Sequence, residues 1–356
     1  MTTKTTERGG ANVTAEPISA AELQARIDEL PRVRLAHLPT PLDHCPRLTA
    51  ALGGPEIYVK RDDMTGLAFG GNKTRQLEFL LAEALEQGAD CVVAGAYTQS
   101  NWCRQITAAT RKLSLDPVLM LVHGEKGPRL QGNLLLDRLM GADVTVVDGE
   151  DMEALTPLLE EKTEALRAAG RRPYLCAPFG LDTLSLSAVG YVNAAIELDA
   201  QLAEAGVRAD WLYMSGANIT PGGMMMGLDA LGAATRVVGI TPIQWSSDRP
   251  TDIARIATAT AARLDLAHAY TAADVINDSG YIGEKYGIVS PAGLEALNLA
   301  ARTEGLILDP VYTAKALSGL IAHIREGRVG MDETVVFLHT GGLPALFAYA
   351  EDLGLG

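Results

Sequence analysis

The chain has 356 residues, 47% of them hydrophobic and 36 of them glycine, and its formal net charge is −14. This length allows one large or two medium domains around a substantial core, and the composition favours an α/β enzyme over a disordered chain. The negative charge argues against nucleic acids and anionic membrane surfaces as partners, because both need a basic face, although it allows a local basic pocket for a small anion.

The N-terminal residues 1–18 lack apolar periodicity, so we expect a mobile tail there. Ser19 followed by Glu22 is typical of a capping box and predicts a first helix that runs to about Leu30. Segment 39–42 contains two prolines and predicts extended backbone, because proline disfavours helix in the residue before it. Regular structure is therefore expected from residue 19 onward.

Short apolar runs alternate with helical patterns along the rest of the chain. The predicted strands are 57–60, 91–95, 118–122, 143–147, 211–214, 237–241 and 334–338. The predicted helices are 46–52, 77–85, 102–112, 130–140, 152–169, 186–205, 251–264, 293–304 and 313–326. Strands that alternate with helices predict parallel sheets covered by helices on both faces.

The four cysteines, Cys45, Cys91, Cys103 and Cys176, include no CxxC pair, so we expect reduced, mostly buried thiols. The six histidines show no HxH or HExxH spacing, and no metal site is expected. No apolar run is long enough to span a membrane, and the N-terminus lacks the basic and apolar segments of a secretory signal. These features together predict a cytoplasmic protein without a membrane partner.

A glycine loop with a single lysine, Gly70-Gly71-Asn72-Lys73-Thr74-Arg75, opens one of the helical patterns. Glycines let the backbone approach a ligand closely, and a lysine at the mouth of a helix can direct its amine into a cleft. Taken alone, the motif fits a loop lysine in water equally well.

Four polar loops lie near the carboxyl ends of predicted strands. They are residues 70–75, 97–101, 215–218 and 339–342. Parallel α/β sheets bind ligands just beyond the carboxyl ends of their strands, so we expect these loops to meet at one site. Each loop alone also fits a solvated turn, but four in one chain favour a concave site for an anion and a cofactor.

Five motifs carry a resemblance to a known family. They are Lys60-Arg61-Asp62-Asp63, Gly70-Gly71-Asn72-Lys73-Thr74-Arg75, Gln99-Ser100-Asn101 with Arg104-Gln105, Leu308-Asp309-Pro310-Val311-Tyr312-Thr313, and His339-Thr340-Gly341-Gly342-Leu343-Pro344-Ala345-Leu346-Phe347. From about residue 38 to residue 354, the chain resembles the 1-aminocyclopropane-1-carboxylate deaminase and D-cysteine desulfhydrase family of pyridoxal-phosphate enzymes. Members of this family share the fold of the tryptophan synthase β-subunit. The motifs are more specific for fold and cofactor than for substrate.

The resemblance implies pyridoxal-phosphate fold type II, an α/β fold of two domains whose twisted, mostly parallel sheets are covered by helices. The large, cofactor-binding domain would comprise residues 19–75 and 196–356, and the small domain residues 76–195. Pyridoxal 5'-phosphate is the implied cofactor, and a homodimer is the family expectation.

The resemblance also implies how the cofactor is held. Lys73 would bind it as a Schiff base and then act as the base at the substrate α-carbon, and burial in a cleft suits both tasks because it lowers a lysine pKa. Asn101 would donate to the phenolic oxygen of the cofactor, and Thr340 would face its pyridine nitrogen. The other residues expected around the cofactor are Asn72, Ser215, Gly216, Ala217, Asn218 and Thr220.

The residues implied for substrate binding are Gln99, Ser100, Asn101 and Trp102. Gln99 and Ser100 would hold the substrate carboxylate, aided by backbone amides at the start of the following helix. Tyr286 and Tyr312 resemble the two active-site tyrosines of the family and are candidates for acid–base work or ring packing. The candidate catalytic residues are thus Lys73, Ser100, Tyr286 and Tyr312.

Three features depart from the family pattern. Trp102 stands where we expect histidine or another polar residue, and it either packs or reshapes the substrate pocket. Gln76 stands where the family usually has a lysine near the phosphate, and losing a charge-assisted contact costs roughly 1.5–3 kcal/mol if nothing replaces it. The phosphate loop, predicted at 215–223, is longer than expected, although Asn218 and Thr220 offer compensating donors.

Thr313 stands where we expect glutamate in the deaminase proper, and this favours the desulfhydrase side of the family. The sequence thus predicts a lyase that removes the α-proton of a small amino acid of the D-cysteine or L-cysteate type, expels the β-substituent and releases pyruvate and ammonia. One alternative is 1-aminocyclopropane-1-carboxylate deaminase activity. Another is a degenerate relative that binds a ligand without chemistry. A nucleotide-dependent enzyme is disfavoured because no GxGxxG follows the first strand.

Overall fold

The computed structural model of the chain describes residues 16–149, 151–152, 154–176 and 180–354. Most of the predicted tail, residues 1–15, lies outside the described residues. The predicted tail extends too far at its other end, because the N–H of Ile18 donates to the carbonyl of Ala230 (2.9 Å) and Ile18 packs against the core. Ser19 then caps helix α1 (Ala20–Asp28) by accepting from the N–H of Glu22 (3.1 Å).

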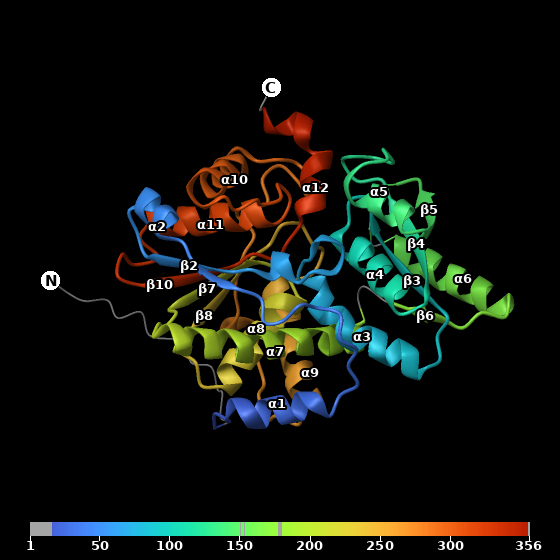
Figure 1. The fold of residues 1–356 in the computed structure, drawn as a ribbon, viewed down its shortest axis with the longest axis horizontal. Helices are drawn as coiled ribbons and strands as arrows, with labels where there is room; N and C mark the ends of the chain where they lie inside the picture. Colours follow the sequence, from blue (N-terminus) through green and yellow to red (C-terminus); the bar gives the residue numbers. More distant parts are fainter. Residues whose placement is uncertain (1–15, 150, 153, 177–179, 355–356) are drawn as a thin grey trace.

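The described residues contain two separate sheets (Figure 1). Their strands are β1 (Leu42–His44), β2 (Glu56–Lys60), β3 (Cys91–Tyr97), β4 (Asp116–Val122), β5 (Asp143–Val147), β6 (Pro173–Leu175), β7 (Trp211–Ser215), β8 (Arg236–Ile240), β9 (Ile276–Asp278) and β10 (Thr334–Leu338). The larger sheet has the order β1-β2-β10-β7-β8-β9, and only β1 runs antiparallel to its neighbour. The smaller sheet, β5-β4-β3-β6, is parallel throughout. The predicted α/β fold with mostly parallel sheets is confirmed.

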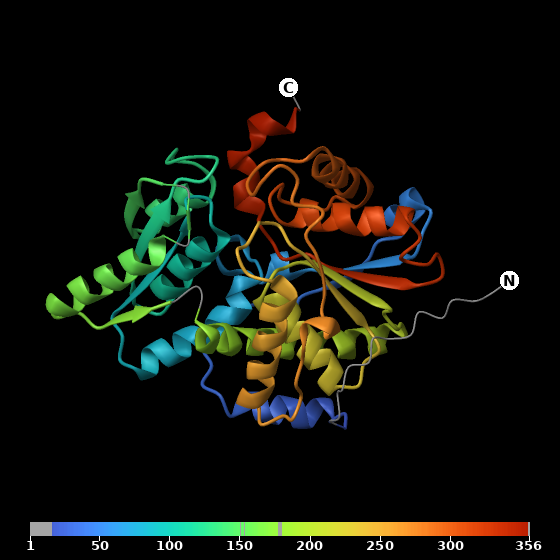
Figure 2. The same ribbon diagram turned by 180° about the vertical axis from the view of Figure 1, so that it is seen from behind.

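Helices cover both faces of each sheet (Figures 1 and 2). The remaining helices are α2 (Pro46–Leu52), α3 (Lys73–Glu86), α4 (Asn101–Lys112), α5 (Gly132–Leu139), α6 (Leu155–Ala168), α7 (Leu181–Ala205), α8 (Ile219–Ala230), α9 (Arg249–Arg263), α10 (Pro291–Glu304), α11 (Thr313–Arg325) and α12 (Leu343–Ala348). Short 3-10 helices are η1 (Asp62–Met64), η2 (Leu67–Phe69), η3 (Ala272–Asp274) and η4 (Ala350–Leu353). Helices α2, α10 and α11 lie on one face of the larger sheet, and α7, α8 and α9 lie on the other. Helix α7 starts at Leu181 and not at 186 as predicted, with Asp182 in its first turn, where the helix dipole favours a carboxylate.

Alternation of side chains along each central strand explains why both sheet faces are covered. In β7, Trp211 and Tyr213 belong to the core under α10 and α11, whereas Leu212 and Met214 belong to the core that contains α7 and α8. Successive side chains of a strand point to opposite faces, so an apolar strand of this kind must be buried on both sides. The prediction of the central strands from continuous apolar runs in the sequence is therefore confirmed.

One apolar core extends across both sheets. It contains Val92 from β3 and Leu212 from β7, together with residues of α3 and α7. These two helices approach closely at Gly190, where a Cβ would overlap the carbonyl of Arg75. The predicted domain boundaries, after residues 75 and 195, fall inside α3 and α7, and the division into two domains stays a prediction.

Three further observations concern the described part of the chain. None of its helices is long and apolar enough to cross a membrane. It also contains no group of three His, Cys, Asp or Glu side chains arranged to hold a metal ion. All four cysteines are buried and free of disulfides, as predicted.

Candidate active site

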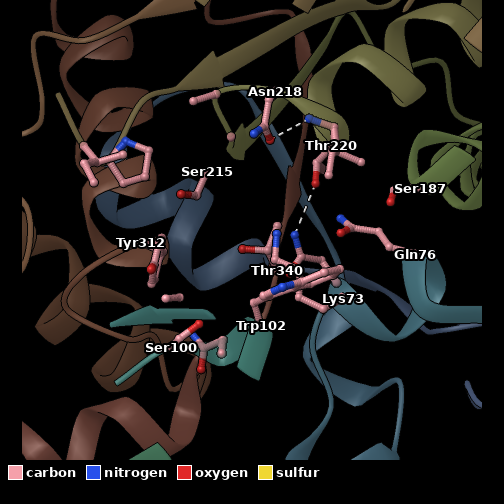
Figure 3. A pocket seen from close by; sticks show the side chains of 18 of the residues that line it. Lys73, Gln76, Ser100, Trp102, Ser187, Ser215, Asn218, Thr220, Tyr312 and Thr340 are labelled. Atoms are coloured by element: carbon pink, nitrogen blue, oxygen red, sulfur yellow. Dashed lines mark hydrogen bonds between the residues drawn. The ribbon is translucent and has the colours of Figure 1, made fainter. Parts of the chain in front are cut away.

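A cavity of about 200 Å³ lies beyond the carboxyl ends of β3, β7, β8 and β10 (Figure 3). Its walls come from strands of both sheets and from the first residues of α3, α4 and α8. Each of the four predicted polar loops, 70–75, 97–101, 215–218 and 339–342, contributes residues to it. The expectation that these loops meet at one site is therefore confirmed.

Lys73 is the first residue of α3 and lines this cavity. Glycine is required just before it, because Gly71 has a φ of 124° and a Cβ there would lie 2.6 Å from Nε2 of Gln105. A Cβ on Gly341 would lie 2.7 Å from Cα of Gly71, so loop 339–342 and the lysine loop touch through their backbones. Burial lowers the pKa of the Lys73 amine to about 8, which increases its neutral fraction near neutral pH.

Asn72 ties three of the loops together. Its N–H donates to the carbonyl of Thr340 (2.9 Å). Its Nδ2 donates to Oγ1 of Thr220 (3.2 Å), a bond that Figure 3 marks by the dashed line from the Thr220 oxygen. Thr220 lies in the first turn of α8, so the lysine, the loop after β10 and the start of α8 are held in a fixed relation. The side chain of Thr340 lines the cavity with Lys73.

The phosphate loop is shorter than the predicted 215–223, because α8 already begins at Ile219. Asn218 caps the helix by accepting from the N–H of Ile219 (2.6 Å). Gly223 is helical, and it is glycine because a Cβ there would overlap the carbonyl of Ala188 in α7. Gly223, one of the glycines that suggested a long loop, thus serves helix packing. Pro221 has no N–H, and the N–H of Gly222 donates to the carbonyl of Asn218 (3.1 Å), so these bonds leave the N–H of Thr220 in the first turn of α8. Together with the helix dipole, this N–H favours an anion.

Gln76 lines the same part of the cavity. It is fully buried, and neither its Oε1 nor its Nε2 has a hydrogen-bond partner in the described structure. Leaving a buried polar group unpaired costs about 1–3 kcal/mol, so this carboxamide is expected to have a partner that is a ligand. Figure 3 shows it beside Ser187 and on the same side as Thr220, next to the start of α8.

Ser100 and Asn101 lie at the start of α4. Ser100 is its N-cap, and its Oγ accepts from the N–H of Cys103 (3.2 Å), which leaves the hydroxyl hydrogen available to a ligand. Both residues line the cavity, and the N-terminus of α4 favours a carboxylate there. Trp102 also lines the cavity and packs partly against the core. Its side chain therefore forms part of the cavity wall.

The role predicted for Gln99 is corrected by the structure. Its Nε2 donates to the carbonyl of Gln131 (3.0 Å) and its Oε1 accepts from the N–H of Asn133 (2.9 Å), so its side chain faces α5 and does not line the cavity. Gln99 lies in a turn closed by the N–H of Ser100, which donates to the carbonyl of Tyr97 (2.9 Å), and Ser100 takes the cavity side. The Gln99 side chain is therefore not placed to hold a substrate carboxylate.

Three tyrosine rings are in contact at one side of the cavity. The rings of Tyr97 and Tyr286 stack with centroids 4.8 Å apart, and Tyr286 meets Tyr312 edge-on at 5.8 Å. The hydroxyls of Tyr286 and Tyr312 hydrogen-bond to each other. Burial raises the pKa of both phenols above the usual range, so both carry their protons at neutral pH. The pair can therefore give a proton to a ligand.

Tyr312 is held in place by Asp309, which lies outside the cavity lining. The carboxylate of Asp309 accepts from the N–H groups of Tyr312 (2.8 Å) and Thr313 (2.9 Å) and from Oγ1 of Thr313 (2.8 Å). Thr313 is thus engaged with Asp309 and does not face the cavity.

Among the described residues that line the cavity none is Asp or Glu, so no carboxylate there opposes an anionic ligand.

Comparison with known proteins identifies the chain. A model of the pyridoxal-phosphate dependent enzyme family matches residues 33–341. The chain belongs to this family. It is 41% identical to proteins named 1-aminocyclopropane-1-carboxylate deaminase from Burkholderia lata, over 333 residues, and Burkholderia multivorans, over 332 residues. In both cases the match covers 91% of this chain and 98% of the relative.

A solved structure described as "Crystal Structure Analysis of the ACC deaminase homologue" is 33% identical, with a TM-score of 0.84 and coverage of 93% of this chain and 98% of that chain. The resemblance and fold type II expected from the sequence are therefore confirmed. The enzyme uses pyridoxal phosphate and belongs to the 1-aminocyclopropane-1-carboxylate deaminase family.

The cavity residues of this enzyme fit the cofactor. An aldehyde needs an amine that is partly neutral, and Lys73 supplies one. A phosphate needs donors, and the unpaired carboxamide of Gln76, the hydroxyl of Thr220 and the start of α8 lie on one side of the cavity. Which atom of the cofactor each residue contacts stays a prediction.

Replacement of Gln76 by leucine is expected to weaken pyridoxal-phosphate binding by about 10- to 100-fold, because a hydrogen bond to a charged group contributes about 1.5–3 kcal/mol. The apo-protein should become more stable, because a buried unpaired amide is removed. Titration of apo-protein with cofactor and thermal melting measure the two effects. Gln131→Leu is the matched control, because Nε2 of Gln131 also lacks a partner but does not line the cavity. Equal cofactor affinity in both variants would contradict the role of Gln76.

The rate at which apo-protein takes up pyridoxal phosphate should rise with pH and level off above about pH 8. Only the neutral amine attacks an aldehyde, and burial lowers the pKa of Lys73 from 10.5 to about 8, so the reactive form is fully present above the lowered value. Rapid-mixing absorbance between about pH 6 and pH 11 measures this profile. A midpoint near the ordinary lysine value would show that the amine is not desolvated in the apo-protein.

Several residues that line the cavity were missed by sequence reasoning. Ile243 and Trp245 follow β8, and the rule that ligands lie beyond strand ends would have indicated them. Thr183 and Ser187 come from α7, whose packing against α8 brings them to the site. No local pattern in the sequence indicates that packing.

Proposed function

We propose that the enzyme opens the cyclopropane ring of 1-aminocyclopropane-1-carboxylate, taking up water and releasing 2-oxobutanoate and ammonia. The observation that carries this proposal is the 41% identity, over 91% of the chain, to relatives that bear the name of this deaminase. These comparisons favour it over the D-cysteine or L-cysteate lyase that the sequence alone favoured.

The bound cofactor supplies an electron sink for the substrate α-carbon. Lys73 anchors the cofactor and, when freed, takes up or returns a proton, for which a pKa of about 8 is suitable near neutral pH. Ser100 and the N-terminus of α4 bind and orient the substrate carboxylate. Asn101 would donate to the cofactor's phenolic oxygen, and Thr340 would face its pyridine nitrogen with a neutral hydroxyl.

Tyr286 and Tyr312 supply the proton that the reaction needs at carbon. When the ring opens, the ring carbon that leaves the α-carbon must be protonated, and a protonated phenol in contact with the substrate can do this. Burial keeps the pKa of both phenols high, and their mutual hydrogen bond lets one reprotonate the other. Asp309 fixes the backbone of Tyr312 by accepting from its N–H (2.8 Å).

A second candidate is β-elimination from a small amino acid of the D-cysteine or L-cysteate type. The observation that favours it is Thr313, which stands where the family resemblance leads us to expect glutamate in the deaminase and which bonds to Asp309 (2.8 Å). A leaving thiolate or sulfite departs with its electron pair and needs less help from an acid than a ring carbon does.

The test is a substrate screen with the purified holoenzyme. The substrates are 1-aminocyclopropane-1-carboxylate, both enantiomers of cysteine and cysteate, β-chloroalanine and serine, and the products measured are oxo acid and ammonia. Turnover of the cyclopropane amino acid with the highest kcat/KM supports the proposal. Turnover of the sulfur compounds alone supports the second candidate. If no compound is turned over, both reactions are refuted, and the result supports a degenerate relative that binds a ligand without chemistry.

Assembly and location stay predictions. We expect a homodimer in the cytoplasm whose partner is a small amino-acid substrate. Light scattering during size-exclusion chromatography measures the mass of the assembly, and a mass of one chain at micromolar concentration would contradict the dimer.

A further inference from the structure

Asn133, the second residue of α5, lies outside the cavity, yet it contacts a residue that lines it. It is fully buried. Its Oδ1 accepts from Nε of Arg104 (2.8 Å), and its Nδ2 donates to the carbonyl of Gln99 (2.8 Å) and to Oδ1 of Asn101 (3.0 Å). The Asn133 carboxamide therefore has a partner at both ends.

The chemistry of these partners fixes the orientation of two carboxamides. Arg104 has only donors, so the Asn133 atom that faces it must be the oxygen. The carbonyl of Gln99 only accepts, so the Asn133 atom that faces it must be the nitrogen. That nitrogen also faces Asn101, and the Asn101 atom in contact with it must therefore be Oδ1. The amide nitrogen of Asn101 is left for the cavity that Asn101 lines.

Arg104 links this orientation to the lysine loop. Its guanidinium donates to the carbonyls of Ala68 and Gly70 (3.0 Å for Gly70) in addition to Asn133. Ala68 and Phe69 have positive φ values of 44° and 71°, an uncommon conformation for residues other than glycine. One buried arginine thus holds the strained turn before Lys73 on one side and sets the polarity of Asn133 on the other.

We propose that Asn133 is a positioning residue that turns the amide nitrogen of Asn101 toward the cavity as a donor to the phenolic oxygen of bound pyridoxal phosphate. The proposal rests on the contact of Asn101 with the cofactor that the proposed function includes. A donor stabilises negative charge on that oxygen, whereas the carbonyl end of the same carboxamide would repel it. The orientation of Asn101 is therefore set before the cofactor binds.

The variant Asn133→Asp reverses the polarity that Asn101 meets. One carboxylate oxygen keeps the contact with Arg104, and the other replaces the amide nitrogen, so Asn101 must turn its own nitrogen away from the cavity. The pH midpoint of the visible absorbance of the holoenzyme reports the proton shared between the phenolic oxygen and the Lys73 nitrogen. Losing the donor destabilises the oxygen once that proton has left, so we expect the midpoint to rise by about 1 pH unit or more. Cofactor affinity should fall about 10-fold.

A double-mutant cycle separates this role from a structural one. Asn101→Ala alone should raise the midpoint, and Asn133→Asp added to it should raise it no further. Asn133→Ala removes the contact with the Asn101 side chain without reversing its polarity, so it should raise the midpoint less than Asn133→Asp. This variant replaces Asn133→Asp in the test if the aspartate variant does not fold. Asn298→Asp, at a half-buried asparagine of α10 that donates to the carbonyl of Leu294 (3.0 Å), should leave the midpoint unchanged.

Three outcomes would overturn the proposal. The first is a rise with Asn133→Asp that is equally large when Asn101 is alanine. The second is an unchanged midpoint in folded Asn133→Asp and Asn133→Ala, even if their apo-proteins melt earlier. The third is an unchanged midpoint in Asn101→Ala, which would also show that Asn101 does not contact the phenolic oxygen of the cofactor. By contrast, the expected shifts in an enzyme that turns over none of the screened substrates would support the positioning role and refute the proposed reaction.

Discussion

Lys73→Ala is expected to abolish covalent attachment of pyridoxal phosphate and to lower turnover by at least about 10³-fold. The effect is large because one amine has two tasks, holding the cofactor and moving a proton at the substrate. The structure suits Lys73 to both tasks. Lys73 is the first residue of α3 and lines the cavity, and burial lowers the pKa of its amine to about 8. Borohydride reduction followed by peptide mass mapping locates the attachment, and steady-state kinetics measure the loss of turnover.

Lys73→Arg and Lys162→Ala are the controls for this prediction. Arginine keeps a positive charge but cannot form a Schiff base, so its turnover should be as low as that of the alanine variant. Lys162 lies on α6, where it pairs with Asp143 at the surface (3.3 Å), and its loss should leave turnover unchanged. Reduction that labels a lysine other than Lys73 would refute the assignment.

The fold could be predicted from sequence wherever the local pattern and the packing agree. The central strands β3, β4, β7 and β10 are continuous apolar runs because both of their faces are buried, and such runs are visible without a structure. The short edge strands β1, β6 and β9 were not predicted as strands. Three residues each give too little periodicity, and their pairing partners decide their conformation.

The start of α8 shows how a pattern can mislead. Two glycines after a proline are typical of a turn, and the sequence predicted a loop to residue 223. In the structure Gly222 and Gly223 lie inside α8. Glycine is needed at 223 because α8 lies so close to α7 that a Cβ there would overlap the carbonyl of Ala188. Glycine at a helix contact and glycine in a turn look alike in sequence, and only the tertiary packing separates them.

Side chains in the site were predictable by type but not by direction. The strand-end loops and the family motifs placed Lys73, Ser100 and Asn101 at one cavity, and the structure does so as well. The motif that contains Gln99 does not show that its side chain turns toward α5. Asn133 carries no motif signal, because its importance comes only from the partners that α5 brings to it.

A buried ionic network beneath the active site makes Arg75 the residue whose loss should cost most stability. Arg75 is 1% exposed, and its guanidinium donates to both carboxylate oxygens of Asp62 (2.9 and 2.8 Å). It also donates to both oxygens of Glu197 (3.0 and 2.9 Å), and Lys60 makes a further ion pair with Glu197. Although burial opposes it, the positive charges of Arg75 and Lys60 lower the pKa of Glu197 to about 2.

Arg75→Met is expected to lower the free energy of unfolding by about 3–5 kcal/mol, because it leaves the carboxylate of Asp62 buried without its cation. Arg325→Met removes an exposed pair with Glu295 and should cost no more than about 1 kcal/mol. Chemical denaturation of both apo-proteins compares the two losses of unfolding free energy.

The ion pairs of Glu197 stabilise the fold above the unfolded pKa of Glu197, 4.5, and this stabilisation is lost as pH falls toward about 2. Arg75→Met should therefore also weaken the dependence of stability on pH in that range. Equal losses in the two arginine variants would mean that the network beneath Lys73 does not stabilise the fold.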